Sequence, residues 1–200
     1  YKRQAEGPQP TGELSDAVVV SMHKTSDDGA CSIHAATGVR KLHSSRRDAF
    51  RPVNTTPLAT VRIENKHVEL ELEHHYEEAR LDTVSRANTT TADRYDEMIV
   101  IRQMVAGPWL TTQEIEDATA SNVDALVIHG TGLGHLPIEN PNDDAPQNIA
   151  LHDSLKKSTL PVLIINQCIH GPVNMNVYSK GRIQQDIGLL GHGITSSPEA

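Results

Sequence analysis

The second half of the chain alternates apolar runs with stretches of helical character, and this order restricts the possible folds more than any other feature. These segments are, in chain order, residues 97–104, 110–122, 124–135, 148–158, 160–168 and 178–190. Three strand–helix units in succession predict a parallel sheet whose strands are joined by crossover helices. The predicted fold class is therefore α/β.

The first half carries short β-branched runs that are typical of strands. Residues 16–23 and 58–65 each predict one strand. Residues 31–42 predict a strand, or a pair of strands around a turn at Thr37 and Gly38.

A charged segment, residues 66–96, separates the two halves and is interpreted as a linker. Within it, the alternation of residues 68–73 is consistent with one exposed edge strand. The expected organisation is a first unit at residues 1–65, the linker, and a second unit at residues 97–200.

Composition limits both the core and the partners of the chain. Aromatic residues make up only 3% of the 200 residues, so the core must be packed from aliphatic side chains. The net charge of −8 argues against nucleic acid binding by this chain alone. No apolar run approaches the roughly 18 residues that a membrane span needs. We therefore expect a cytoplasmic protein that makes no membrane contact.

The cysteines and histidines do not form a metal motif. Cys31 and Cys168 are far apart in sequence, and the simplest interpretation is two reduced thiols. Cys168 and His170 are a conceivable nucleophile–base pair, but two residues of strand span about 6.6 Å, which is long for a direct hydrogen bond. The eleven histidines lack ligand spacing, so we expect no metal.

A cluster of cations follows the predicted strand that ends near Lys41. Arg46 and Arg47 come shortly after this lysine, and Asp48 follows them directly. A lysine in such a place could transfer a proton to or from a hydroxyl nucleophile. The alternative is a surface patch in which Asp48 pairs with one of the arginines.

Two segments of the second half leave the carboxyl ends of predicted strands, where ligands bind in open α/β sheets. The first is GTGLGH, Gly130–His135, which is either a plain tight turn or a place where backbone N–H groups approach a ligand. The second is NQCIHGPVNMNVYSKGR, Asn166–Arg182, which offers amides, a thiol, a histidine and Tyr178.

These residues carry a resemblance to a known family. The run TSDDGACSIHAATGVRKLHSSRRDAFRPVN, Thr25–Asn54, resembles the L-asparaginase-like amidohydrolases. More narrowly, the blocks RKLHSSRRDAFR, VIHGTGLGH and NQCIHGPVNMNVYSKGR resemble the D-subunit family of archaeal glutamyl-tRNA(Gln) amidotransferases. The resemblance implies the two-domain asparaginase-like fold. It assigns the end of the N-terminal domain to residues 1–65 and most of the C-terminal parallel-sheet domain to residues 97–200.

The resemblance also implies a catalytic set of threonine, lysine and aspartate. The family's lysine follows an Arg-Asp pair in an R-D-x-x-K pattern, and alignment on Arg47 and Asp48 places it at Arg51, whereas Lys41 is the nearest lysine. Both remain candidates. Thr131 and His135 are the expected contribution of the C-terminal domain to a substrate site in a homodimer.

The threonine-bearing blocks of the family, T-G-G-T and G-T-D-T, do not occur ahead of Lys41. We therefore expect a fragment truncated at both ends, which is inactive by itself because its nucleophilic threonines are missing.

The implied function is that of a glutaminase subunit. It would hydrolyse glutamine and supply ammonia for the conversion of Glu-tRNA(Gln) to Gln-tRNA(Gln). The implied partners are the E subunit of the amidotransferase, a second copy of the chain, and Glu-tRNA(Gln), which is held mainly by the E subunit. No cofactor is implied for this chain, while ATP and Mg are implied for the E subunit. The alternatives are a free L-asparaginase and a non-catalytic scaffold module.

Overall fold

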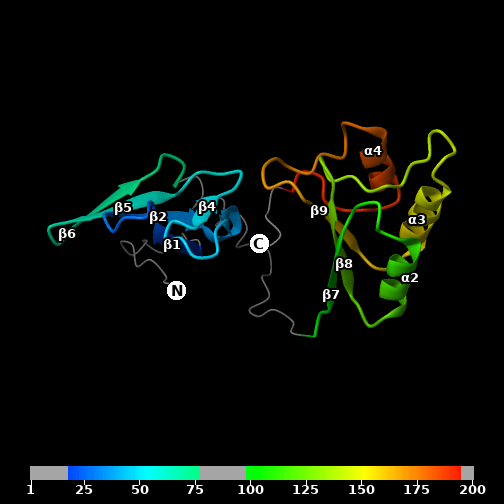
Figure 1. The fold of residues 1–200 in the computed structure, drawn as a ribbon, viewed down its shortest axis with the longest axis horizontal. Helices are drawn as coiled ribbons and strands as arrows, with labels where there is room; N and C mark the ends of the chain where they lie inside the picture. The colour runs from blue at the N-terminus through cyan, green and yellow to red at the C-terminus, as the bar shows by residue number, and fades with distance from the viewer. Residues whose placement is uncertain (1–17, 77–97, 195–200) are drawn as a thin grey trace, which may run out of the picture. The chain divides into compact units, whose positions relative to one another are not determined.

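The computed structural model describes residues 18–76 and 98–194. The chain divides into two compact units, and these two ranges are their described parts (Figure 1). Most of the linker expected at residues 66–96 lies outside the described residues.

The first unit is built on an antiparallel sheet of order β1-β2-β5-β6. Its strands are β1 (Val19–His23), β2 (Ala30–Ala35), β5 (Ala59–Glu64) and β6 (His67–Leu72). The strands predicted at residues 16–23 and 58–65 correspond to β1 and β5, although residues 16 and 17 lie outside the described ranges. The alternation at residues 68–73 does form an edge strand, β6, and every residue of β6 is exposed.

A second, two-stranded sheet completes the first unit. It pairs β3 (Val39–Lys41) with β4 (Phe50–Pro52), and a short 3₁₀ helix, η1 (Ala36–Gly38), connects β2 to β3. The chain turns at Thr37 and Gly38 as expected, but β3 pairs with β4 and not with β2. We refer to residues 39–52 as the β3–β4 hairpin.

The second unit is the predicted α/β unit. Its sheet consists of β7 (Ile101–Val105), β8 (Ala125–Gly130) and β9 (Val162–Asn166), which are parallel and lie in chain order. The helices are α2 (Thr112–Ala120), α3 (Pro146–Lys157) and α4 (Ser179–Asp186). The order of elements follows the sequence prediction, and the main difference is that β7 begins later than residue 97.

The start of α2 shows why the sequence predicts a helix there. The Thr111 hydroxyl accepts a hydrogen bond from the backbone N–H of Glu114, and a Glu114 carboxylate oxygen accepts one from the backbone N–H of Thr111. This reciprocal capping box satisfies two N–H groups that a helix start would otherwise leave without partners.

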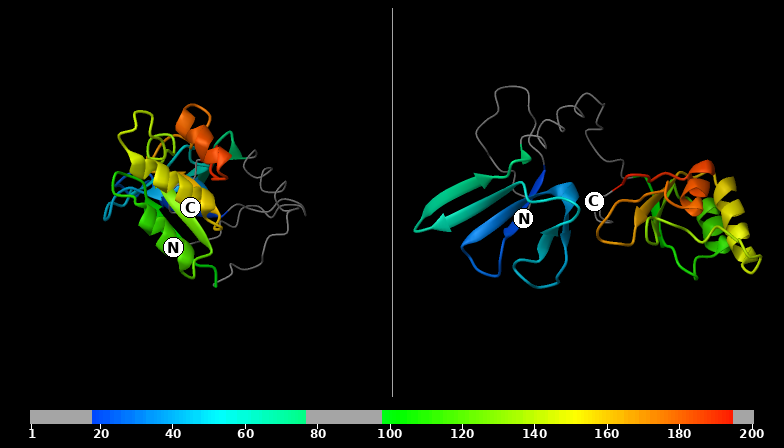
Figure 2. Two further views of the ribbon diagram at one scale, coloured as in Figure 1. Left: turned by 90° about the vertical axis from the view of Figure 1, so that its right-hand side faces the viewer. Right: turned by 90° about the horizontal axis from the view of Figure 1, so that it is seen from above.

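The core of the second unit lies between the sheet and the pair α2 and α3, which pack side by side over one sheet face (Figures 1 and 2). Fully buried residues contributed by the strands and helices include Ile115, Ala118, Leu126, Ile128, Leu151, Leu155, Val162 and Ile164. Burying one such aliphatic side chain contributes about 1.5–3 kcal/mol. As the composition predicts, this core is aliphatic, and it holds the strand ends that carry the candidate site.

Candidate functional site

The two candidate cations of the first unit lie on the paired strands of the β3–β4 hairpin. Lys41 is opposite Phe50, and Arg40 is opposite Arg51. Opposed residues of antiparallel strands share a face, and consecutive residues alternate. Lys41 and Arg51 therefore project from opposite faces of the hairpin.

Arg51 is anchored by other groups of the first unit. Its Nη2 donates to Asp48 Oδ2 at 2.5 Å, and its Nη1 donates to the carbonyl of Lys24 at 3.2 Å. The Asp48 side chain is only 3% exposed. The Arg51 guanidinium thus binds a buried carboxylate and the backbone carbonyl of the residue that follows β1.

Asp48 also pairs with Arg46 through two hydrogen bonds of 2.8 Å each. The hydrogen bond from Arg46 is the main reason why the pKa of Asp48 is lower than its ordinary value, and the charge of Arg51 acts in the same direction. The carboxylate is therefore ionised and lies between two guanidinium groups.

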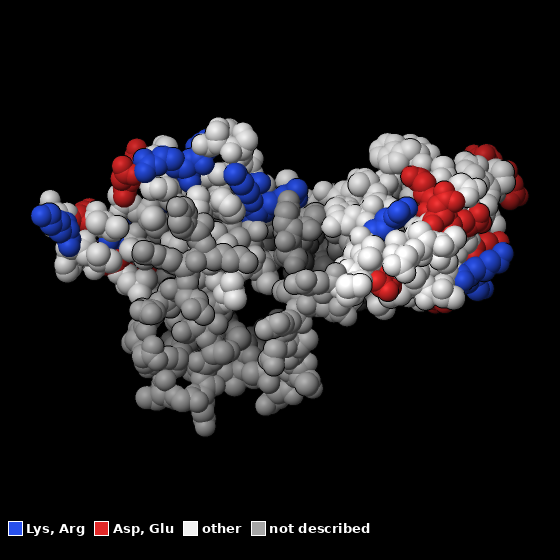
Figure 3. Space-filling view, turned by 90° about the horizontal axis from the view of Figure 1, so that it is seen from below, with Lys and Arg blue, Asp and Glu red and all other residues white. Residues whose placement is uncertain are grey.

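Lys41, in contrast, is exposed, and the structure gives its side chain no hydrogen bond or ion pair with any described residue. Arg47, the remaining cation of the cluster, pairs with Asp28 and lies 3.3 Å from His23 Nε2. Figure 3 shows Lys and Arg side chains along the surface of the first unit. Arg46, Arg47 and Arg51 each have a carboxylate partner, so Lys41 is the candidate that remains available to a ligand.

The candidate residues of the second unit are the two ends of one tight turn after β8. Thr131 N donates to the carbonyl of His135 at 2.9 Å, and His135 N donates to the carbonyl of Thr131 at 2.8 Å. The Thr131 hydroxyl also donates to the His135 carbonyl, at 3.1 Å. Gly134 has a φ of +93°, which favours glycine. The structure therefore brings Thr131 and His135 together.

The turn borders a hollow of about 400 Å³ in the second unit. Its lining residues are Gly107, Pro108, Leu110, Thr131, His135, Leu136, Pro137, Gln147, Asn148, Leu151 and Lys180. The His135 ring meets Tyr178 edge-on, with 5.4 Å between the ring centroids. We refer to Thr131, His135, Tyr178 and Lys180 as the glycine-turn site.

His135 is held in an environment that favours the neutral ring. Burial is the main reason why its pKa is lowered, the charge of Lys180 lowers it further, and Glu139 acts in the opposite direction. Its Nε2 atom is buried and has no hydrogen-bond partner among the residues that the structure describes. A neutral imidazole with a free nitrogen can donate to or accept from a ligand group, depending on its tautomer.

Tyr178 and Lys180 were not predicted as site residues. Both belong to the segment that follows β9, and that segment was noted because the carboxyl ends of adjacent parallel strands meet at one edge. Proximity to His135 singles them out within that segment, and the sequence alone does not contain this information.

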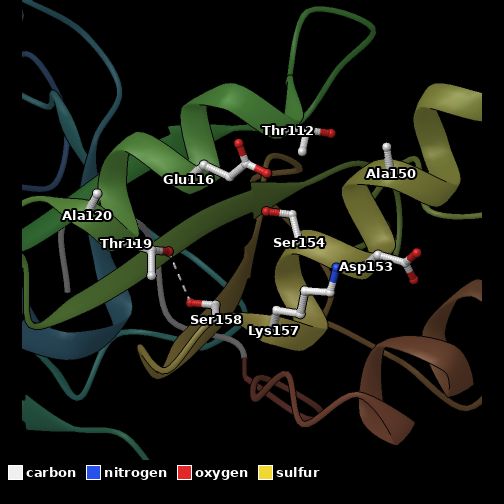
Figure 4. A pocket seen from close by; sticks show the side chains of 9 residues that line it. All are labelled: Thr112, Glu116, Thr119, Ala120, Ala150, Asp153, Ser154, Lys157 and Ser158. Carbon is white, nitrogen blue, oxygen red and sulfur yellow. Dashed lines mark hydrogen bonds between the residues drawn. The ribbon is translucent and has the colours of Figure 1, made fainter.

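A larger hollow of about 530 Å³ is a groove between α2 and α3 (Figure 4). Thr119 and Ser158 meet across it, with 3.3 Å between their hydroxyl oxygens. None of the predicted site residues lines this groove, so its size does not make it the candidate site.

The nucleophile pair considered at Cys168 and His170 gains no support. Both residues are exposed, and the described residues include no hydrogen bond between them. The 18–76 and 98–194 ranges contain no group of three or more His, Cys, Asp or Glu side chains arranged to hold a metal ion. No helix in these ranges is long and apolar enough to cross a membrane.

Comparison with known proteins shows which sequences this chain is similar to. Residues 10–76 match the family described as Asparaginase, N-terminal. The D subunit of glutamyl-tRNA(Gln) amidotransferase from Methanosphaera stadtmanae is 36% identical over 176 residues, which cover 88% of this chain and 36% of that protein. The D subunit from Sulfolobus acidocaldarius is 33% identical over 185 residues, 90% of this chain and 36% of that protein. The chain thus spans about a third of the length of these curated relatives.

Solved structures agree on the fold. The thermostable L-asparaginase from Thermococcus kodakarensis superposes with a TM-score of 0.63 at 18% identity, over 90% of this chain and 47% of that one. L-asparaginase I from Vibrio cholerae gives a TM-score of 0.56 at 21% identity, over 84% of this chain and 45% of that one. With its antiparallel first unit and its parallel second unit, the chain has the fold of the L-asparaginases, and along most of its length its sequence is similar to amidotransferase D subunits.

Proposed function

We propose that this chain is part of the glutaminase subunit of a tRNA-dependent amidotransferase. The full protein would hydrolyse glutamine to glutamate and ammonia, and the ammonia would convert Glu-tRNA(Gln) to Gln-tRNA(Gln). The observation that carries the proposal is the 36% identity over 176 residues to a protein named as the D subunit of such an enzyme.

Hydrolysis of an amide requires a nucleophile, a group that takes up and returns a proton, and donors for the developing oxyanion. We assign the proton-transferring role to Lys41, because its side chain is exposed and has no partner among the described residues. Arg51 is unsuited to this role because arginine does not give up its proton, and because its guanidinium is occupied by Asp48.

The nucleophile in this proposal is a threonine from the rest of the full-length protein. The family's threonine-bearing blocks have no counterpart ahead of Lys41 in this sequence. The 200 residues by themselves are therefore proposed to be inactive.

The glycine-turn site would contribute to a substrate site formed with a second copy of the chain. Thr131 and His135 suit this role because both line the same hollow. The E subunit of the amidotransferase would hold Glu-tRNA(Gln) together with ATP and Mg, and this chain would need no cofactor.

The test is ammonia release by the complete polypeptide that contains this sequence. Glutamine and asparagine are compared as substrates, with and without the E subunit and Glu-tRNA(Gln), in the wild type and in Lys41→Ala and Arg51→Ala. Glutamine-dependent release that rises with the tRNA-bound partner and collapses in Lys41→Ala is the expected result. Release from asparagine that ignores the partner would identify a free asparaginase. If neither amide is hydrolysed, the chain belongs to a non-catalytic module.

A further inference from the structure

Helix α4 contains a glutamine, Gln184, that is 0% exposed. Its Oε1 accepts a hydrogen bond from the backbone N–H of Leu136 at 2.9 Å. Its Nε2 donates to the carbonyl of Gly134 at 2.9 Å. One side chain therefore holds the peptide groups on both sides of His135.

These two bonds are energetically important because no water reaches them. A buried amide that loses one of its partners leaves a polar group unsatisfied, which costs more than the bond itself contributes. The Gln184 side chain and the turn thus fix each other. Because the backbone on both sides of His135 is held, the direction in which its side chain leaves the turn is also held.

The same helix also reaches the His135 ring. Tyr178 directly precedes α4 and makes the edge-on contact with the imidazole. The helix start lies against the preceding segment at Gly181, where an added Cβ would come within 2.4 Å of the Met175 carbonyl oxygen. A larger residue at this position would push away the helix that carries both contacts.

We propose that Gln184 is a positioning residue for His135: it fixes the turn so that the imidazole is held in one orientation at the edge of the hollow that it lines. This inference rests on the proposed function for the place of His135 in the substrate site, but the geometry that it predicts can be measured without activity. Gln184 itself lines neither of the two hollows described above.

The test uses the complete polypeptide, labelled with ¹³C at histidine Cε1, with the His135 signal assigned by its loss in His135→Gln. The Gln184→Met substitution keeps the approximate size and shape of the side chain and removes its hydrogen bonds to Leu136 N and to the Gly134 carbonyl. The expected result is a displaced or broadened His135 signal, together with a titration midpoint that rises toward the ordinary histidine value as the ring becomes better solvated. The kcat for glutamine hydrolysis is expected to fall about tenfold or more.

The matched control is Gln185→Met on the same helix. Gln185 Nε2 donates to the Met175 carbonyl and to Asn176 Oδ1, and not to the turn. This variant is expected to leave the His135 signal unchanged. If Gln184→Met does not fold, Gln184→Glu takes its place, because it keeps the acceptor for Leu136 N and removes the donor to Gly134.

A Gln184 variant whose unfolding midpoint falls while its His135 signal and titration match the wild type would overturn the inference, because Gln184 would then be a purely structural residue. A His135→Gln variant with normal ammonia release would instead overturn the proposed role of His135. The signal of His135 in the Gln184 variants would still decide whether Gln184 positions the ring.

Discussion

The buried carboxylate of Asp48 and the guanidinium of Arg51 form an ion pair in the β3–β4 hairpin, with 2.5 Å between Oδ2 and Nη2. Arg46 binds the same carboxylate from within the loop that joins the two strands. Most cations of this cluster therefore bind carboxylates of the first unit. These pairs hold the loop, while Lys41 projects from the opposite face of the hairpin and has no partner among the described residues.

Asp48→Asn is expected to lower both stability and ammonia release. The amide removes the negative charge that two guanidinium groups share, and it offers one acceptor oxygen instead of two. Because the pKa of Asp48 is lowered in the folded state, its stabilising contribution is present above pH 3.8 and is lost as the pH falls through the lower folded value. Urea unfolding of wild type and variant should therefore converge at acid pH.

The matched control is Asp28→Asn, which breaks the pair between Asp28 and Arg47. Both side chains of this pair are at least half exposed. Exposed ion pairs contribute only about 0–1 kcal/mol. An Asp28 variant as unstable as the Asp48 variant would contradict the view that burial of Asp48 makes its pairs important.

Lys41→Arg is expected to be nearly as inactive as Lys41→Ala. The substitution keeps the positive charge and the exposure, but an arginine does not release a proton. Loss of a group that transfers a proton costs roughly 100-fold or more in rate. Initial rates of ammonia release measure this effect, and Lys156→Arg on α3 is the control that should retain full activity. Full activity of Lys41→Arg would mean that Lys41 contributes only charge.

The second unit is more predictable from sequence than the first because its elements are long and each carries its own signal. The Thr111–Glu114 capping box marks the start of α2, and the aliphatic run of β9 has the length of a buried strand. The β3–β4 hairpin lacks such signals, since strands of three residues are too short to show alternation. The ion pairs of Asp48 with Arg46 and Arg51, which hold the loop of the hairpin, are contacts between side chains and leave no periodic pattern in the sequence.

In the candidate site, too, features with a local sequence signal were predictable, and contacts made by side chains were not. The glycine turn was predicted from its position after a strand, and the structure brings Thr131 and His135 together there. Gln184 was not predicted, because it lies in the polar sequence SKGRIQQD, where nothing separates a buried glutamine from an exposed one.

Thr111→Ala is expected to destabilise the second unit by about 1 kcal/mol, the usual cost of losing a threonine N-cap. The alanine removes the hydroxyl that accepts from Glu114 N. Chemical denaturation followed by circular dichroism measures the change. Thr112→Ala is the control, since Thr112 is the first residue of the helix and not its cap. Equal losses in both variants would show that the cap is not the source of the effect.

His34 of β2 is buried, with only 3% of its surface exposed, and its Nδ1 atom has no hydrogen-bond partner within residues 18–76 and 98–194. Burial is the main reason why its pKa is lowered from 6.5, and the charge of Arg51 lowers it further. The folded state therefore binds a proton at His34 less readily than the unfolded state does.

Acidification is accordingly expected to destabilise the first unit through His34. Its contribution to stability is fully present above pH 6.5 and is lost as the pH falls from there through the lower folded pKa, because protons then bind preferentially to the unfolded state. Urea unfolding of the wild type and of His34→Leu, from about pH 8 down to about pH 5, should show a flatter pH dependence in the variant. His67→Gln on the exposed strand β6 is the control and should keep the slope of the wild type. Parallel profiles for wild type and His34→Leu would mean that another group causes the acid sensitivity.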